Sequence, residues 1–393
     1  MTNSSTNGWQ ARGAEKRARC QSLIPKAWEL PSALVQSLSH PLESSKNNLI
    51  ELDIARRSGL LTEKELRITE AYDVRGLLKA LASGELTSLE LSLLFNNLSL
   101  NLLLFKTADS HNNVFGRTLN PWNTSLTAGG STGGEGALIA FRGSPLGVGT
   151  DVAGALEIFL KSVINSRPAL LDCTVADVPW RNVGPPKPRL RFGILAEDPL
   201  LPWHPPVKKA VSDTADLLRA QGHEIVPLTA QECFTAASYD VATQLFSLDK
   251  TSAEILAKGG EPLVPSLVYI RGAMKEVKFD RDFLPDTRAI KDGLERLSIL
   301  NTKRYEIQDL WKKMWVARGL DAVIGPGAQT TAVEHDMYAL APYTYNPANL
   351  EGAPTSIQVI TTTMRDEECL EIAKLIDTYV KVETRNGASA SKL

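Results

Sequence analysis

The stretch from Asn120 to Phe159 constrains this chain more than any other segment. Nine of the 27 glycines lie in it, and most fall into two clusters, Gly129–Gly134 and Gly147–Gly154. Glycine weakens regular structure, so such density indicates tight turns or a backbone that approaches a ligand closely. Turns of this kind direct backbone N–H groups at an anion or oxyanion. A structural turn would explain the first cluster alone, but the pair predicts a binding or catalytic loop.

An apolar run, Ala137–Phe141, separates the two clusters. It predicts a buried strand or helix between two functional loops.

The two clusters together resemble the amidase signature family, in particular its fungal acetamidase-like branch. The first reads Gly-Gly-Ser-Thr-Gly-Gly at 129–134, and the second reads Gly-Ser-Pro-Leu-Gly-Val-Gly-Thr-Asp-Val-Ala-Gly-Ala-Leu-Glu at 143–157. The order and spacing follow the family signature. The resemblance extends to Asn113–Pro121 and to much of the chain after Pro168.

This resemblance implies hydrolysis of a small carboxamide to a carboxylic acid and ammonia, without a metal or cofactor. The family uses a Ser–Ser–Lys triad, in which a lysine of lowered pKa activates a nucleophilic serine through a bridging serine. Ser131 falls on the bridging serine. The resemblance assigns ligand and oxyanion binding to Gly129, Gly130, Thr132, Asp151, Val152, Ala153 and Gly154.

The triad is incomplete in this sequence. The nucleophile position holds Ala155, and Glu157 stands where the family has arginine. Ala153 replaces a glycine of the oxyanion loop. The family's apolar strand ending in Lys-Asp is absent; Lys106 follows an apolar run, but Thr107 comes next, and we expect a surface or structural role for this lysine.

Several functions therefore stay open. The chain is either a catalytically impaired amidase, including a pseudoenzyme that binds a ligand or partner, or an active amidase of a small-metabolite pathway. An active enzyme would need a replacement nucleophile, with Ser131 first and Thr150 second. The sequence also lacks segments that family members have, at 96–106, after Ile158 and at 343–349. Skipped exons in the gene model would produce such gaps.

Composition argues against several classes of binding partner. A net charge of −2 and a pI near 6.3 argue against a nucleic-acid binder. The four cysteines and five histidines show no ligand spacing, so we expect no metal and a reducing compartment. No apolar run is long enough to cross a bilayer, so no membrane partner is expected.

The predicted fold is α/β, a mixed β-sheet with helices on both faces, as in a truncated amidase-signature fold. A strand at Leu190–Ala196, a helix opened by Pro206 and ended by Gly222, and a strand at His223–Leu228 form a β–α–β unit. Residues 230–318 are predicted mainly helical. Further elements are a strand at Leu320–Gly325, a strand at Gly352–Val359 and a helix at Arg365–Val380.

We expect a loose N-terminal segment at 1–45, one domain at 46–380 and a flexible tail at 381–393. Capping boxes at Thr62/Glu65 and Thr87/Glu90 predict helix starts, and Gly84 predicts a helix end. The tail ends Ser391-Lys392-Leu393, a tripeptide that the peroxisomal import receptor reads. The sequence thus predicts a peroxisomal protein, with the cytoplasm as the alternative.

Overall fold

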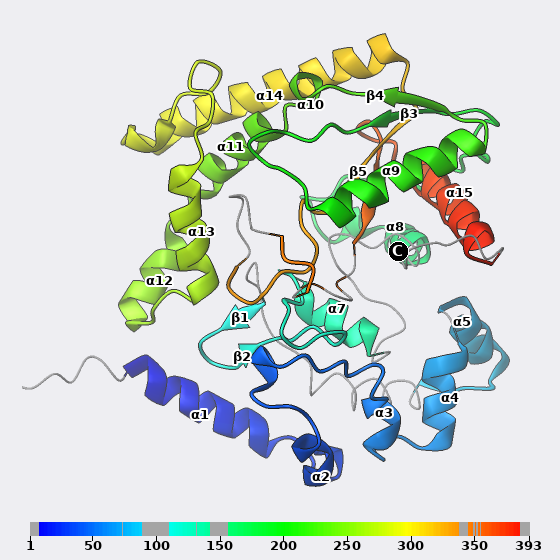
Figure 1. Cartoon of the computed structure of the whole chain (residues 1–393), viewed down its shortest axis with the longest axis vertical. Helices are drawn as coiled ribbons and strands as arrows, with labels where there is room; N and C mark the ends of the chain where they lie inside the picture. The colour runs from blue at the N-terminus through cyan, green and yellow to red at the C-terminus, as the bar shows by residue number, and fades with distance from the viewer. Residues whose placement is uncertain are drawn as a thin grey trace, which may run out of the picture.

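A four-stranded mixed sheet organises the chain. The computed structural model describes residues 8–72, 74–88, 110–130, 132–141, 156–337, 345–348, 350, 353 and 355–385. The sheet has the order β4-β3-β5-β6. Its strands are β3 (Arg191–Ile194), β4 (Glu224–Pro227), β5 (Ala322–Pro326) and β6 (Ile357–Ile360), and helices cover both of its faces (Figure 1).

The β–α–β unit predicted from the sequence is confirmed. Strands β3 and β4 pair in parallel, with Phe192 opposite Ile225, and α9 (Pro205–Ala220) connects them. Pro205 and Pro206 occupy the first turn of α9, where the missing N–H costs nothing. Gly222, with φ +86°, turns the chain back toward β4.

Strand β6 differs from its prediction in length. It runs antiparallel to β5, with Val323 opposite Ile360 and Pro326 opposite Ile357. The strand begins at Ile357, and beyond it the Gly327 N–H donates one further hydrogen bond to the Ser356 carbonyl at 2.9 Å. Gly352, where the predicted strand starts, lies outside the described residues.

Two apolar layers hold the sheet between helices. On one face, Phe192 and Ile324 are fully buried against Leu218 of α9 and Ile372 of α15 (Asp366–Arg385). On the other face, Val323 packs with residues of α10 (Ala230–Cys233) and α14 (Gly293–Arg318). The predicted mixed sheet with helices on both faces is therefore confirmed.

Gly193 of β3 packs closely against the second layer. A Cβ atom there would lie 2.9 Å from side-chain atoms of both Leu320 and Val323. This position requires glycine for close packing rather than for an unusual backbone angle.

Residues 230–318 are mainly helical, as predicted, and α14 ends at Gly319 with φ +61°. Trp315 of α14 is buried, and Trp311 packs against the same layer. The remaining helices of this region are α11 (Thr235–Phe246), α12 (Thr251–Gly259), α13 (Pro265–Glu276) and the short η4 (Thr287–Ala289).

The N-terminal region is more ordered than expected. Residues 8–45, expected to be loose, instead contain α1 (Gly8–Ser22), and Arg17 Nη1 of this helix donates a 2.7 Å hydrogen bond to the Val114 carbonyl. Other short elements of this region are η1 (Lys26–Trp28), α2 (Ser32–Gln36), η2 (Leu42–Ser44) and α3 (Ile54–Arg57).

The next two helices begin and end as predicted where the structure describes them. Helix α4 (Glu63–Ala71) starts with the Thr62/Glu65 capping box, in which Thr62 Oγ1 accepts from the Glu65 N–H at 3.3 Å. Helix α5 (Val74–Ser83) is followed by Gly84, with φ +76°. Glu90, the partner in the second predicted capping box, lies outside the described residues.

Three further elements complete the described part: α7 (Gly133–Ala140), α8 (Leu156–Asn165) and η3 (Pro168–Leu170). The apolar run Ala137–Phe141, for which strand and helix were both open, forms the second half of α7 and the residue after it. No helix in the described ranges is both long and apolar enough to cross a membrane.

Candidate active site

The first glycine cluster leads directly into α7. A small hairpin of β1 (His111–Asn112) and β2 (Gly116–Arg117) precedes it, and the chain then runs through residues 118–130 to the helix (Figure 1). Gly129, Gly130 and Thr132 are described. We call the segment 129–133 the glycine loop; Ser131 within it lies outside the described residues.

Gly129 has a backbone conformation that glycine favours. Its φ is +82°, a region that other L-residues rarely adopt. Its N–H donates to Thr127 Oγ1 at 2.9 Å, and its carbonyl accepts from Ser110 Oγ at 2.6 Å. Hydrogen bonds on both sides of this residue hold the start of the glycine loop in one shape.

Ser110 is the buried support of the loop. It is fully buried, and its carbonyl accepts from the Thr118 N–H at 3.0 Å, so its own position is fixed by the chain leaving the hairpin. A Cβ atom at Gly133 would lie 2.4 Å from Ser110 Oγ and 2.9 Å from the Ala128 carbonyl oxygen. Gly133 is therefore required by close approach between loop and support.

A distant segment, residues 330–336 after β5, completes the framework. The Thr127 N–H donates to the Val333 carbonyl at 2.7 Å. His335 Nε2 lies 2.9 Å from the Thr124 carbonyl oxygen, a distance at which it donates when protonated on that nitrogen.

The same segment forms an ion pair with a buried arginine of the hairpin. Arg117 Nη2 lies 2.7 Å from Asp336 Oδ2, and the arginine side chain is only 4% exposed. This charge-assisted contact connects β2 to the segment 330–336.

The first turn of α7 faces the loop with backbone donors. The Gly136 N–H makes the first intrahelical hydrogen bond, to the Thr132 carbonyl at 2.9 Å. The N–H groups of Gly133, Gly134 and Glu135 therefore have no acceptor within the helix. Such groups, together with the helix dipole, stabilise negative charge, as on the oxygen of a carbonyl under attack.

The remaining predicted site residues lie outside the described part of the chain. These are Ser131, Thr150, Asp151, Val152, Ala153, Gly154 and Ala155, with the lysine Lys106. Helix α8 begins at Leu156, immediately after the nucleophile position. The expectation that Ser131 and Ala155 lie close together stays a prediction.

The lysines of the described part differ from a catalytic base. All are exposed or half-buried. The half-buried ones are Lys161, 5.0 Å from the Trp180 ring centre, Lys303, paired with Glu306, and Lys374, paired with Glu371. A lysine acts as a base near neutral pH when burial lowers its pKa. Lys106 and Lys392 lie outside the described residues.

Sequence reasoning missed Ser110 and the segment 330–336. Ser110 lies 19 residues before the glycine that it supports and carries no signal of burial, and Arg117 and Asp336 are 219 residues apart. Covariation between these positions in an alignment of related sequences is the signal that would have indicated such contacts.

Fold and loop together define a class: an α/β protein whose glycine loop presents backbone donors at a helix start. The Amidase family model matches residues 104–158. An amidase of Gibberella moniliformis is 23% identical over 95% of this chain and 99% of its own length. An acetamidase of Emericella nidulans is 23% identical over 93% of this chain and 97% of its own. Over nearly its whole length the chain is therefore similar to fungal amidases, and the Amidase family model matches its glycine-rich segment.

A solved structure supports the fold assignment. A fatty acid amide hydrolase matches with a TM-score of 0.78 at 18% identity, covering 96% of each chain. The two fungal alignments extend over 542 and 568 positions, more than the 393 residues of this chain. Both relatives therefore contain internal segments that have no counterpart here.

Proposed function

We propose that this amidase-family chain binds small carboxamides at the glycine loop and hydrolyses them poorly or not at all. One observation carries the proposal: the family's nucleophile position holds Ala155, whose methyl group cannot attack a carbonyl. The exposed or half-buried lysines of the described part add support, because none has the surroundings of a base.

The binding half of the proposal rests on the loop framework. Gly129 keeps its hydrogen bonds to Ser110 and Thr127, and the first turn of α7 keeps N–H groups without intrahelical acceptors. These donors would bind the oxygen of a carboxamide whether or not a nucleophile is present. No metal or cofactor enters the proposal.

The proposal that hydrolysis is poor or absent rests on the effect of losing one residue of a catalytic triad. Residues of a catalytic unit act together, so losing one costs about as much as losing all, on the order of 10⁴-fold or more in turnover. Restoring serine at position 155 alone would therefore leave the chain without a base.

A second candidate is an active amidase that uses Ser131 as its nucleophile, with Thr150 as a further possibility. The position of Ser131 favours it, because this serine lies two residues before Gly133, where the unpaired donors of α7 begin.

An amide series separates the two functions. Acetamide, propionamide and hexanamide are offered to the unmodified chain, to Ala155→Ser and to Ser131→Ala, with ammonia release as the readout. Ser44→Ala, an exposed serine remote in sequence from the loop, serves as the matched control. We expect no turnover above the Ser131→Ala level, and acetamide binding detectable by ligand-observed NMR.

Two results would contradict the proposal in different ways. Clear turnover by the unmodified chain that disappears in Ser131→Ala would establish the active amidase. An unmodified chain that neither turns over nor binds any of the amides would remove the binding half.

We also propose that the chain is imported into the peroxisome through Ser391, Lys392 and Leu393, which lie outside the described residues. The support is the tripeptide at the end of the sequence. The chain is fused at its N-terminus to a fluorescent protein and compared with a version ending at Ala390. Punctate signal only in the full chain supports import, whereas diffuse signal in both assigns the protein to the cytoplasm.

A further inference from the structure

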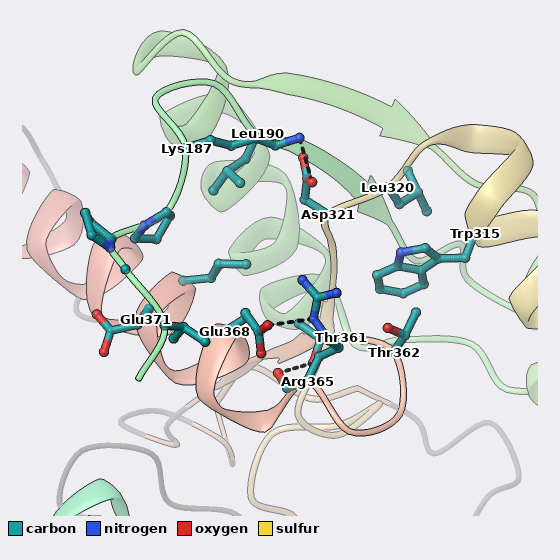
Figure 2. Close-up of a pocket in the computed structure, with 15 residues that line it drawn as sticks. Lys187, Leu190, Trp315, Leu320, Asp321, Thr361, Thr362, Arg365, Glu368 and Glu371 are labelled. Atoms are coloured by element: carbon teal, nitrogen blue, oxygen red, sulfur yellow. Dashed lines mark hydrogen bonds and ion pairs between the residues drawn. The ribbon is translucent and has the colours of Figure 1, made fainter. Parts of the chain in front are cut away.

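A cavity of about 420 Å³ lies at one end of the sheet beside a proline-rich connector (Figure 2). The connector, residues 183–187, forms one wall, and the start of α15 forms another. Trp315 and Leu320 line it near the end of α14. The volume is within the range of pockets that bind small organic molecules.

This cavity is separate from the glycine loop. Leu190 directly precedes β3 and Asp321 directly precedes β5, so the cavity lies at the N-terminal ends of these parallel strands. The chain leading into the glycine loop is hydrogen-bonded to residues 330–336, which follow the C-terminal end of β5. The two places therefore occupy opposite ends of the sheet.

Arg365, the residue directly before α15, extends its side chain into the cavity. Its guanidinium points between Trp315 and Asp321, with the terminal nitrogens directed into the open space (Figure 2). Its Nε lies 2.8 Å from Glu368 Oε1. Within the described ranges, the two terminal nitrogens have no acceptor.

A second arginine, Arg181, holds Glu368 and thereby stabilises the orientation of Arg365. Arg181 Nη1 donates to Glu368 Oε1 at 3.0 Å and Arg181 Nη2 to Glu368 Oε2 at 2.6 Å. Burial alone would raise the pKa of Glu368, but the Arg181 hydrogen bonds and the nearby Arg365 outweigh it and lower that pKa. Glu368 is thus held as a carboxylate, and it holds Arg365 in place.

The other carboxylates of the wall already have cationic partners. Asp321 Oδ1 lies 2.8 Å from Lys187 Nζ, and its Oδ2 accepts from the Arg191 N–H at 2.8 Å. Glu371 lies 2.7 Å from Lys374. The Arg365 fork is therefore the donor that is available to an incoming acceptor.

We propose that this cavity binds a small organic carboxylate with an apolar body. The planar guanidinium matches a carboxylate through two parallel hydrogen bonds. The apolar body would pack against Trp315, Leu320 and Ile372. An inorganic oxyanion would satisfy the guanidinium but would leave this apolar wall uncovered.

Benzoate is the probe that tests the site, by isothermal titration with the full chain. Benzamide has the same ring without the charge, and inorganic phosphate has charge without the ring. We expect benzoate to bind more tightly than either. Arg365→Gln should weaken benzoate at least tenfold, and Arg365→Lys, which keeps the charge without the fork, should weaken it less.

Arg219→Gln is the matched control, because Arg219 is an exposed arginine on α9 that pairs with Asp216. It should bind benzoate like the unmodified chain, and circular dichroism should show all variants folded. The inference does not depend on the proposed function, so Ser131→Ala should also leave benzoate binding unchanged.

Three results would overturn the inference. These are no benzoate binding at millimolar concentrations, phosphate binding as tight as benzoate binding, or an affinity for benzoate that Arg365→Gln leaves intact. Loss of benzoate binding in Ser131→Ala but not in Arg365→Gln would place the carboxylate at the glycine loop instead.

Discussion

Gly133→Ala tests whether the glycine loop lies against its support as described. The added Cβ would lie 2.4 Å from Ser110 Oγ and 2.9 Å from the Ala128 carbonyl oxygen. The hydroxyl can rotate away, but the carbonyl belongs to the backbone immediately before Gly129. Gly136 in the same helix is the matched control, because a Cβ there would meet nothing within 4 Å.

The expected magnitude comes from two opposing effects. Replacing glycine by alanine in a helix favours folding by about 0.5–1 kcal/mol. Forcing a methyl group into a filled space costs about 1–3 kcal/mol. Most of the propensity gain is common to both variants, so the difference in unfolding free energy between Gly133→Ala and Gly136→Ala should be about 1–3 kcal/mol.

Urea unfolding followed by circular dichroism measures this difference. We expect a lower midpoint for Gly133→Ala and a slightly higher one for Gly136→Ala than for the unmodified chain. In a Ser110→Ala background the cost of Gly133→Ala should shrink but not vanish, because the Ala128 carbonyl contact remains. Equal midpoints for the two glycine variants would refute the described packing of the loop.

Three further predictions concern other parts of the fold. Thr62→Ala removes the capping box of α4 and should lower the unfolding free energy by about 1 kcal/mol, whereas the exposed Thr302→Ala on α14 should change it less. Arg281→Met removes the 2.6 Å partner of Asp240, which is 1% exposed, but leaves Arg288 at 3.7 Å, so it should cost about 2 kcal/mol in urea unfolding; Arg304→Met, an exposed control, should cost little. Burial lowers the pKa of His223, so the unfolded chain takes up its proton first and stability should fall as pH drops below about 6.5. Unfolding midpoints between pH 7.5 and 5 should therefore fall less steeply in His223→Gln, and an unchanged slope would show that this histidine does not contribute.

Local rules predicted the elements whose ends are determined by neighbouring residues. Thr62 and Glu65, and the glycines at 84, 222 and 319, set helix boundaries through contacts within one or two turns. In α9 the apolar residues recur at helical spacing on the face that meets the sheet, with Val207, Val211 and Leu218 buried.

Elements that depend on distant partners were less predictable. Residues 1–45 were expected to be loose, but α1 within them is rich in alanine, arginine and other good helix formers, and Arg17 of this helix donates a hydrogen bond to the Val114 carbonyl. The extent of β6 follows from the length of β5, which the sequence around residue 357 does not encode.

For the candidate site, sequence indicated the glycine loop and the substituted nucleophile position. The family signature is local and ordered, so a single chain reveals it. The support of the loop is not local: Ser110 acts through a hydrogen bond to Gly129, and Val333 through one to Thr127. Neither contact leaves a pattern in the residues beside it.

The contact between Thr127 and Val333 can form only late in translation, after Val333 has been synthesised. These residues are separated by most of the central part of the chain, yet the Val333 carbonyl accepts the Thr127 N–H at 2.7 Å. At about 5–20 residues per second, a ribosome needs on the order of 10–40 s to make the intervening polypeptide. During that interval the nascent loop lacks its second support, so chaperones that bind emerging chains would meet it in an unfinished state.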